Sequence, residues 1–348
     1  MENTQDSNSF LGKIARGVVF AIGAAATATV VSKSIRSHRE LSLKDKVVLV
    51  TGGGRGLGLI LARKLSAYGA RIVICGRSEE TLRKASTELS SKARQFLAIP
   101  CDVTDLEQVK QMVSRIKNEI GSIDILINNA GIIQVGPQET MNREDYEEAM
   151  NTHFWGPFNL INEVLPDMKR KNSGNIVNIG SIGSKVSFPH LLPYNASKYA
   201  LAGLSEGLTA ELQKNNINVT TVYPGLMRTG SPRNIDVKGQ HKKEYGWFKI
   251  ADSIPFLSMN ADEAAEKIIG ALKKGSPTLT LSVPAKLAVA AHGIAPGVSI
   301  TAFNIINALL PEKKGGDVTR KGYESESRVS SSFLTNKTDE AARKNLEM

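Results

Sequence analysis

The feature that most constrains the fold is the alternation of short apolar runs with amphipathic stretches between residues 46 and 283. The apolar runs are rich in Val and Ile and nearly continuous in hydrophobicity, as are strands buried on both faces. They lie at 47–50, 71–75, 95–100, 123–128, 175–180, 217–223 and 278–283. Amphipathic stretches with helical periodicity separate them at 57–68, 79–90, 105–119, 143–170 and 193–214. We therefore predict an α/β fold in which helices cover both faces of a doubly wound, seven-stranded parallel sheet.

The composition excludes several classes of protein. The chain has 348 residues, of which 41% are hydrophobic and 22% are charged, as is usual for a soluble protein and not for a multi-span membrane protein. Cys75 and Cys101 are too few for a disulfide framework or a cysteine-rich zinc site, and we expect both to be small buried residues. The five histidines lack metal-ligand spacing, which predicts no metal site. They are His38, His153, His190, His241 and His292.

A glycine-rich turn follows the first predicted strand, with the sequence TGGGRGLG at 51–58. A strand that enters a helix through glycines exposes backbone N–H groups and the positive end of the helix, and together they can hold a pyrophosphate. Glycine is required because a Cβ would block the close approach and disfavour positive φ angles. The turn therefore predicts a dinucleotide site. Its predicted contacts are Gly52, Arg55, Gly56, Leu57 and Gly58.

The end of the second strand predicts which dinucleotide is bound. An NAD-specific protein places Asp or Glu there to accept hydrogen bonds from the adenosine ribose, but this chain has Gly76 followed by Arg77. Arg77 and Arg55 can flank a 2′-phosphate, because planar guanidinium groups suit that anion. The sequence thus favours NADP(H) over NAD(H).

Further motifs follow in order along the chain. They are Asp102-Val103, Asn128-Asn129-Ala130-Gly131, Asn151, Ser181, the segment from Tyr194 to Lys198, and Pro224-Gly225 with Thr229. Tyr194 and Lys198, four residues apart, lie on one face of a helix, so the ammonium group can lie near the phenol. Taken together over 44–283, these residues resemble the short-chain dehydrogenase/reductase superfamily in its single-domain branch, which has a Rossmann fold.

The resemblance implies roles for these residues. Asn151, Ser181, Tyr194 and Lys198 match the catalytic tetrad of the family, in which Tyr and Lys also contact the cofactor. Asp102 would bond the adenine with Val103 beside it. The remaining cofactor contacts implied are Asn129, Ala130, Gly131, Pro224, Gly225 and Thr229, whereas Asn128 is mainly structural.

The leading hypothesis for function is an NADP(H)-dependent oxidoreductase of a secondary alcohol or ketone, with a lipophilic substrate competing with a small polar one. The alternative is a non-catalytic NADP-binding or scaffold protein recruited to membranes. The complete tetrad favours the enzyme. We also expect a homo-oligomer. No nucleic-acid partner is predicted, because the net charge of +10 comes without aromatic residues interleaved among Lys and Arg.

The two ends of the chain form predicted segments 1–43 and 284–348 on either side of the domain. Residues 17–32 carry no charge and predict a helix of about 24 Å, slightly short of the roughly 30 Å hydrocarbon core. A membrane anchor, an interfacial helix, a signal peptide and a helix packed on the domain stay open. A removable signal fits least, because the domain suits an intracellular cofactor. Basic residues at 33–46 would keep the domain on the cytoplasmic face of a membrane.

The C-terminal segment has two predicted parts. Residues 284–310 predict a broken pair of amphipathic helices, and 311–348 predict an extended polar chain. The region after Gly225 contains Trp247 and Phe248, for which anchoring of a substrate lid and local packing are equally supported.

Overall fold

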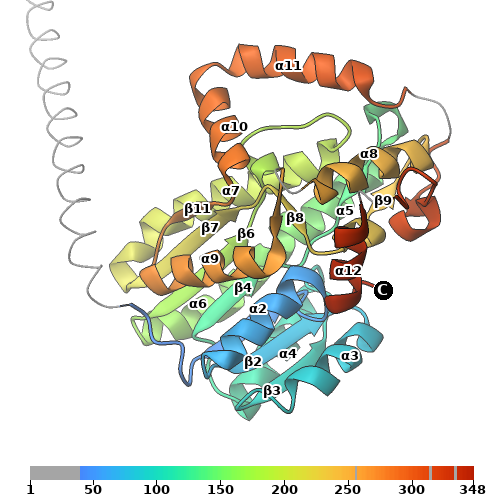
Figure 1. The fold of residues 1–348 in the computed structure, drawn as a ribbon. Helices are drawn as coiled ribbons and strands as arrows, with labels where there is room; N and C mark the ends of the chain where they lie inside the picture. Colours follow the sequence, from blue (N-terminus) through green and yellow to red (C-terminus); the bar gives the residue numbers. More distant parts are fainter. Residues whose placement is uncertain (1–39, 255–256, 313–315, 333–334) are drawn as a thin grey trace, which may run out of the picture. The chain divides into compact units, whose positions relative to one another are not determined.

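The computed structural model describes residues 40–254, 257–312, 316–332 and 335–348. Its central sheet has seven parallel strands in the order β11-β7-β6-β4-β1-β2-β3, which confirms the predicted doubly wound α/β fold (Figure 1). The strands are β1 (Val47–Thr51), β2 (Arg71–Gly76), β3 (Phe96–Pro100), β4 (Ile125–Asn128), β6 (Gly174–Ile179), β7 (Ile217–Tyr223) and β11 (Thr278–Thr280). Every residue of β1 and β4 is buried, as their continuous apolar sequences require.

The order of the strands places a crevice next to β1. The chain runs from β1 outward through β2 and β3, and then returns to form β4 on the other side of β1. Loops that follow β1 and β4 therefore diverge at the carboxyl ends of the strands. Such a topological switch point is where open α/β sheets bind ligands.

Helices cover both faces of the sheet. They are α2 (Gly56–Ala67), α3 (Glu79–Leu89), α4 (Leu106–Glu119), α5 (Arg143–Met150), α6 (Gly156–Arg170), α7 (Leu192–Leu212), α8 (His241–Ser253) and α9 (Ala261–Lys274). One core joins alternate strand residues such as Leu49 to Met112 of α4 and Leu160 of α6. Cys75 and Cys101 are buried in this core, which confirms the small apolar role predicted for them. On the opposite face α2 and α9 lie side by side.

Beyond β11 the chain forms the predicted helix pair, α10 (Val283–Ile294) and α11 (Pro296–Leu309), broken at the Ala295–Pro296 step. The last strand ends earlier than the sequence predicted, because the Ser282 side chain caps α10 by accepting a hydrogen bond from the N–H of Ala285 at 3.3 Å. The pair differs from an ordinary amphipathic hairpin, since no residue of α11 is buried.

The prediction of an extended chain at 311–348 is wrong. The short strand β12 (Arg320–Lys321) pairs antiparallel with β9 (Asp236–Val237), which in turn pairs with β5 (Gln134–Val135). After it, α12 (Asn336–Lys344) packs against α8 and near β8 (Leu226–Arg228), the partner of β10 (Ser258–Asn260). Polar side chains are buried here by bonding one another, a stabilisation that local sequence does not reveal.

The helix predicted at 17–32 lies outside the described residues. Among the helices of the described part, none combines the length and the apolar character that crossing a bilayer needs.

Candidate functional site

The turn after β1 is packed so closely that it admits only glycine at key positions. Gly52 has a φ of +63° and Gly56 a φ of +55°, both in the left-handed region. A Cβ on Gly58 would overlap the carbonyl oxygen of Gly52 and would lie 2.6 Å from Nδ2 of Asn129. Because of this contact, α2 begins directly at the crevice with its N–H end facing the opening.

The Asn-Asn-Ala-Gly segment after β4 locks this turn in place. Oγ1 of Thr51 accepts hydrogen bonds from the backbone N–H groups of Asn129 and Ala130, both at 2.9 Å. Nδ2 of Asn129 donates to the carbonyl of Thr51 at 2.9 Å. Asn128 bonds Asn178 of β6 at 2.8 Å, which extends the network across the sheet. The structure therefore places these predicted residues at one point of the crevice.

Two arginines lie at the turn and beside it. Thr51 pairs in register with Cys75, so Arg77, just after β2, emerges beside the glycine-rich turn. Its side chain is exposed. Arg55, in the turn itself, has a side chain 43% exposed. No acidic residue lies at Gly76, so this corner of the crevice is cationic.

The segment after β3 supplies two further predicted residues. Oδ1 of Asp102 accepts bonds from the N–H and the hydroxyl of Thr104, each at 2.9 Å. Val103 is buried, and a Cβ on Gly156 would lie 2.9 Å from its Cγ2. The position of Asp102 is thus held by its own loop.

Ser181, Tyr194 and Lys198 come together at the carboxyl end of β6. Ser181 follows the strand and accepts a hydrogen bond from the N–H of Gly183 at 3.0 Å. Nζ of Lys198 donates to the carbonyl of Ile179, the last residue of β6, at 2.8 Å. The same Nζ lies 5.7 Å from the centre of the Tyr194 ring. One helix, α7, therefore brings both Tyr194 and Lys198 to the serine.

Burial shifts the pKa values of this group. It lowers the pKa of the Lys198 ammonium to about 7. It raises the pKa of Tyr194, and the interaction with Ser181 lowers that pKa by a smaller amount. In the protein by itself, burial therefore outweighs the hydrogen bond to Ser181 in setting the pKa of Tyr194.

The fourth residue of the predicted tetrad, Asn151, lies in a segment that packs against α7. A wider helical turn, Asn151–Trp155, joins α5 to α6, and the side chain of Asn151 is exposed there. His153 is buried instead. Its Nδ1 lies 2.7 Å from Oγ of Ser197, its Nε2 accepts the N–H of Ile132 at 3.1 Å, and its ring is edge-on to Tyr194 at 5.4 Å.

The hydrogen bonds of His153 define its tautomer. The hydroxyl of Ser197 donates to the carbonyl of Tyr194, so Nδ1 of His153 must carry the proton that it shares with Ser197. Burial, with the positive charge of Lys198, holds the pKa of His153 well below its usual value, so the ring is neutral. Sequence reasoning missed this residue, although the buried positions Gly156 and Leu160 extend back along the helix to 153.

The loop after β7 closes the site on its other side. The carbonyl of Pro224 accepts the N–H of Ile182 at 2.7 Å, which joins this loop to the Ser181 turn. Gly225 packs against the start of α10, where its Cβ would lie 3.2 Å from Oγ of Ser282. Thr229 is buried. These predicted residues therefore line the same crevice.

The N–H end of α2 is in contact with the C-terminal residues of the chain. The backbone N–H of Gly56 donates to the carbonyl of Asn345 at 2.8 Å, and a Cβ on Gly56 would overlap Oε1 of Glu347. The carboxylate of Glu347 also lies 3.4 Å from Nε of Arg55. An anionic group thus already fits this position, and a dinucleotide phosphate fits by the same chemistry. Sequence reasoning had no signal for this tail contact.

Trp247 and Phe248 have local packing roles in α8. Phe248 is buried in a small apolar cluster with Tyr245 and residues of β5 and β9, and Trp247 packs against it. Nε1 of Trp247 donates to Glu244 at 2.8 Å, and Glu244 contacts Nδ1 of His190 at 3.0 Å. This helix is therefore anchored to the loop that precedes Tyr194.

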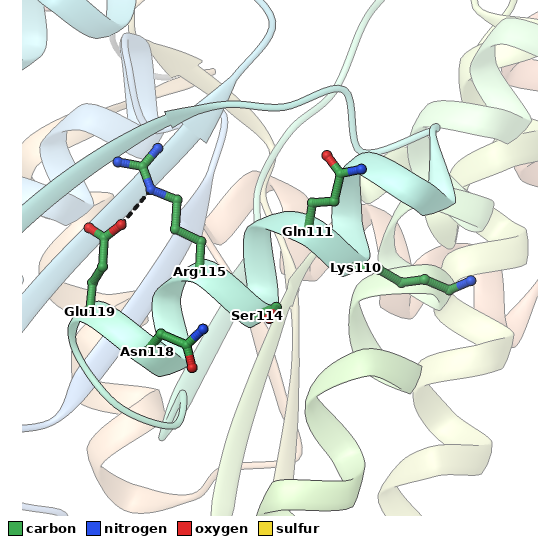
Figure 2. A pocket seen from close by; sticks show the side chains of 6 residues that line it. All are labelled: Lys110, Gln111, Ser114, Arg115, Asn118 and Glu119. Carbon is green, nitrogen blue, oxygen red and sulfur yellow. Dashed lines mark hydrogen bonds and ion pairs between the residues drawn. The ribbon is translucent and has the colours of Figure 1, made fainter.

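A surface hollow of about 550 Å³ lies on α4, away from these residues (Figure 2). It is lined by Lys110, Gln111, Ser114, Arg115, Asn118 and Glu119. One helix supplies all of these side chains, and Arg115 is paired with Glu119 at 2.7 Å, so we assign it no function. Within the described residues, no group of three or more His, Cys, Asp or Glu side chains is placed to hold a metal ion.

Comparison with known proteins places the chain among dehydrogenases. The family model described as short chain dehydrogenase matches residues 46–238. A fatty acyl-CoA reductase from Acinetobacter baylyi is 31% identical over 282 residues, covering 80% of this chain and 90% of that protein. Dehydrogenase/reductase SDR family member 7B from Bos taurus is 34% identical over 263 residues, covering 74% of this chain and 79% of that protein.

Solved structures show the same fold. A short-chain dehydrogenase from Streptomyces avermitilis has a TM-score of 0.66 and 29% identity, covering 77% of this chain and 99% of that one. A gluconate 5-dehydrogenase from Burkholderia cenocepacia, in complex with NADP and tartrate, has a TM-score of 0.62 and 27% identity, covering 71% of this chain and 98% of that one.

The environment of His153 predicts a contrast between two nearby substitutions. His153→Leu removes both ring bonds and leaves the N–H of Ile132 without its partner, so we expect a loss of about 1–3 kcal/mol in the free energy of unfolding. Asn151→Ala, at an exposed position, should change it by less than about 0.5 kcal/mol. Urea unfolding of the two variants measures this, and equal losses would contradict the stabilising role of the His153 hydrogen bonds.

Proposed function

The chain belongs to the short-chain dehydrogenase/reductase family of oxidoreductases acting on CH–OH and carbonyl groups, and on that premise we propose that it transfers a hydride between NADP(H) and a lipophilic secondary alcohol or ketone. The observation that carries this proposal is the convergence of Ser181, Tyr194 and Lys198 in the crevice that begins at the glycine-rich turn. A binding module would not require that set.

Tyr194, Ser181 and Lys198 have separate roles in carbonyl reduction. The bound cofactor supplies the hydride. Tyr194 donates a proton to the carbonyl oxygen, and Ser181 donates a hydrogen bond to the same oxygen, which stabilises the charge that develops there. In the reverse direction, a positive charge beside Tyr194 favours its phenolate form. Lys198, whose ammonium group donates to the carbonyl of Ile179, supplies part of that charge when protonated, and it would hold the nicotinamide ribose of a bound cofactor.

Selectivity for NADP(H) rests on the cationic corner at the end of β2. Arg77 is exposed and available to a 2′-phosphate, Arg55 becomes available when Glu347 leaves it, and Gly76 offers no carboxylate to the ribose of NAD(H). The gluconate 5-dehydrogenase with the same fold is itself in complex with NADP. These observations support NADP(H) as the cofactor.

A lipophilic substrate and a membrane location are supported by the α10–α11 pair. Phe303 of α11 contacts Phe188, in the loop between Ser181 and Tyr194, with ring centres 5.0 Å apart. Apolar side chains more than half exposed cover the pair; they are Val283, Leu287, Ile294, Val298, Ile300, Ile305 and Leu309. An exposed apolar surface of this kind marks an interaction site, and no acidic residue lies between 283 and 311 to repel anionic lipid. A relative is named as a fatty acyl-CoA reductase.

The role of Tyr194 predicts the result of removing one oxygen atom. Tyr194→Phe cannot donate the proton, so turnover should be abolished while NADPH affinity stays within about twofold. A panel of ketones followed through NADPH absorbance measures turnover. Tyr199→Phe, an exposed tyrosine on the same helix, is the matched control and should remain active. Near-normal kcat in Tyr194→Phe would sink the assignment and favour a non-catalytic NADP-binding protein.

The cationic corner predicts a change confined to one cofactor. Arg77→Ala removes a bond to a charged group worth about 1.5–3 kcal/mol, so NADPH binding should weaken about tenfold or more while NADH binding barely changes. Arg83→Ala, at an exposed site on α3, should leave both unchanged. Calorimetric titration with each cofactor measures the effect, and an equal loss for NADPH and NADH would refute the 2′-phosphate role.

The location predicts how the chain fractionates. We expect the full chain to pellet with membranes and a version beginning at Leu41 to become largely soluble. Ile294→Ser with Leu309→Ser in the full chain should reduce the pelleted fraction, because these side chains are 85% and 82% exposed. Full-length protein found wholly in the supernatant at low salt, and sedimenting as an oligomer, would show that the apolar surfaces meet another copy instead.

A further inference from the structure

The end of the chain lies on the cofactor side of the crevice. The carbonyl of Asn345 accepts a hydrogen bond from the N–H of Gly56. The Glu347 carboxylate contacts the same glycine and lies 3.4 Å from Nε of Arg55. A backbone N–H at a helix N-terminus and a guanidinium are the groups that hold phosphate oxygens. Asn345 and Glu347 therefore use donors that the phosphates of NADP(H) need, namely the N–H at the pyrophosphate turn and the guanidinium of Arg55.

The tail also contacts the opposite wall of the crevice. Nδ2 of Asn345 donates to the carbonyl of Thr229 at 3.2 Å. Gly230 has a φ of +93°, and a Cβ there would overlap Ala342 of α12. The helix and its last residues thus bridge the glycine-rich turn and the loop after β7, between which an extended dinucleotide would lie.

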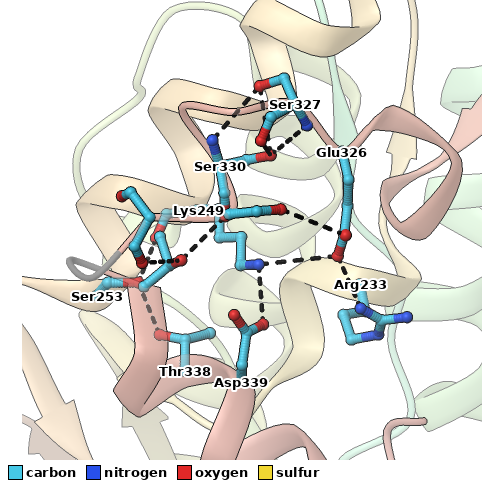
Figure 3. Close-up of polar contacts among 11 residues, drawn as sticks. Arg233, Lys249, Ser253, Glu326, Ser327, Ser330, Thr338 and Asp339 are labelled. Atoms are coloured by element: carbon cyan, nitrogen blue, oxygen red, sulfur yellow. Dashed lines mark hydrogen bonds and ion pairs between the residues drawn. The ribbon is translucent and has the colours of Figure 1, made fainter.

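Side-chain contacts hold α12 on α8 (Figure 3). Nζ of Lys249, which is 1% exposed, lies 2.8 Å from Oδ1 of Asp339, and the hydroxyls of Ser253 and Thr338 are 2.8 Å apart. These bonds involve neither the glycine-rich turn nor residues 345–348. They can keep α12 near the domain when the last residues leave the turn.

Burial acts against the charged form of Glu347 in the contact of the final residues. The side chain of Glu347 is buried. Nδ2 of Asn234 donates a hydrogen bond to its Oε2 at 2.6 Å, and Arg55 lies beside it. The pKa of Glu347 is nevertheless raised to about 7, because the effect of burial exceeds the opposing effects of Arg55 and Asn234. The charged carboxylate is therefore held at a cost, as suits a group that a stronger anion can displace.

We propose that the C-terminal residues 345–348 are a built-in competitor of the dinucleotide: Glu347 occupies the pyrophosphate position, and cofactor binds only when this segment leaves the glycine-rich turn. The proposal rests on the proposed function, because it assumes a dinucleotide at that turn. With such competition, the apparent affinity for the dinucleotide equals the intrinsic affinity multiplied by the fraction of molecules whose turn is open. A segment docked in about nine molecules of ten weakens binding about tenfold.

Equilibrium titration of NADPH, followed by its fluorescence, tests the proposal on the full chain and on two variants. A chain ending at Lys344 keeps α12 and should bind NADPH about tenfold more tightly. Glu347→Ala removes the contacts with Asn234 and Arg55 that hold the segment, so it should bind several-fold more tightly. Glu340→Gln, an exposed acid of α12, is the matched control and should bind like the full chain.

Hydrogen exchange gives a second readout that needs no variant. Saturating NADPH should speed exchange of the amides of 345–348 in the full chain. Unchanged affinity in both variants with unchanged exchange would overturn the competitor while the dehydrogenase assignment stands. Weaker binding by the shortened chain would also overturn it, because the tail would then clasp the cofactor. Failure of every version to bind NADPH or NADH would overturn the proposed function together with this inference.

Discussion

The contact between Gly58 and the carbonyl of Gly52 is the constraint on which the site depends. It lets α2 start within one turn of β1, and the hydrogen bonds that Thr51 accepts from the segment after β4 hold that geometry at the switch point of the sheet. The positive end of α2 then faces the crevice. An anion of some kind is the expected occupant, and the chain brings one of its own in Glu347.

The catalytic side of the crevice depends on satisfying buried polar groups. Lys198 is almost wholly buried, and the carbonyl at the end of β6 fixes its ammonium group. His153 also satisfies buried polar groups, since its two ring nitrogens bond the turn after β4 and the part of α7 beside Tyr194. Because each group has a defined partner, Tyr194 and Ser181 are held in one arrangement before any substrate arrives.

The parts of the structure that were predictable from sequence are those determined locally. Continuous apolar runs predicted the seven strands, and the glycine spacing predicted the turn, because burial and positive φ angles restrict which residues can occupy those positions. His153 was missed because two residues two positions apart on a helix face different sides, and the wider turn at 151–155 determines that residue 153 points inward. The C-terminal segment was missed because polar pairs such as Lys249 and Asp339 meet only in the folded chain.

The central claim is that these residues carry hydride transfer to a carbonyl carbon. Incubation of the full chain with a ketone and NADPH labelled with deuterium at the transferring position of the nicotinamide tests it directly, with mass spectrometry of the alcohol as the measurement. The account predicts one deuterium on the carbinol carbon with the full chain and none with Tyr194→Phe. Alcohol formed without deuterium, or no alcohol from any ketone while NADPH is bound, would contradict it.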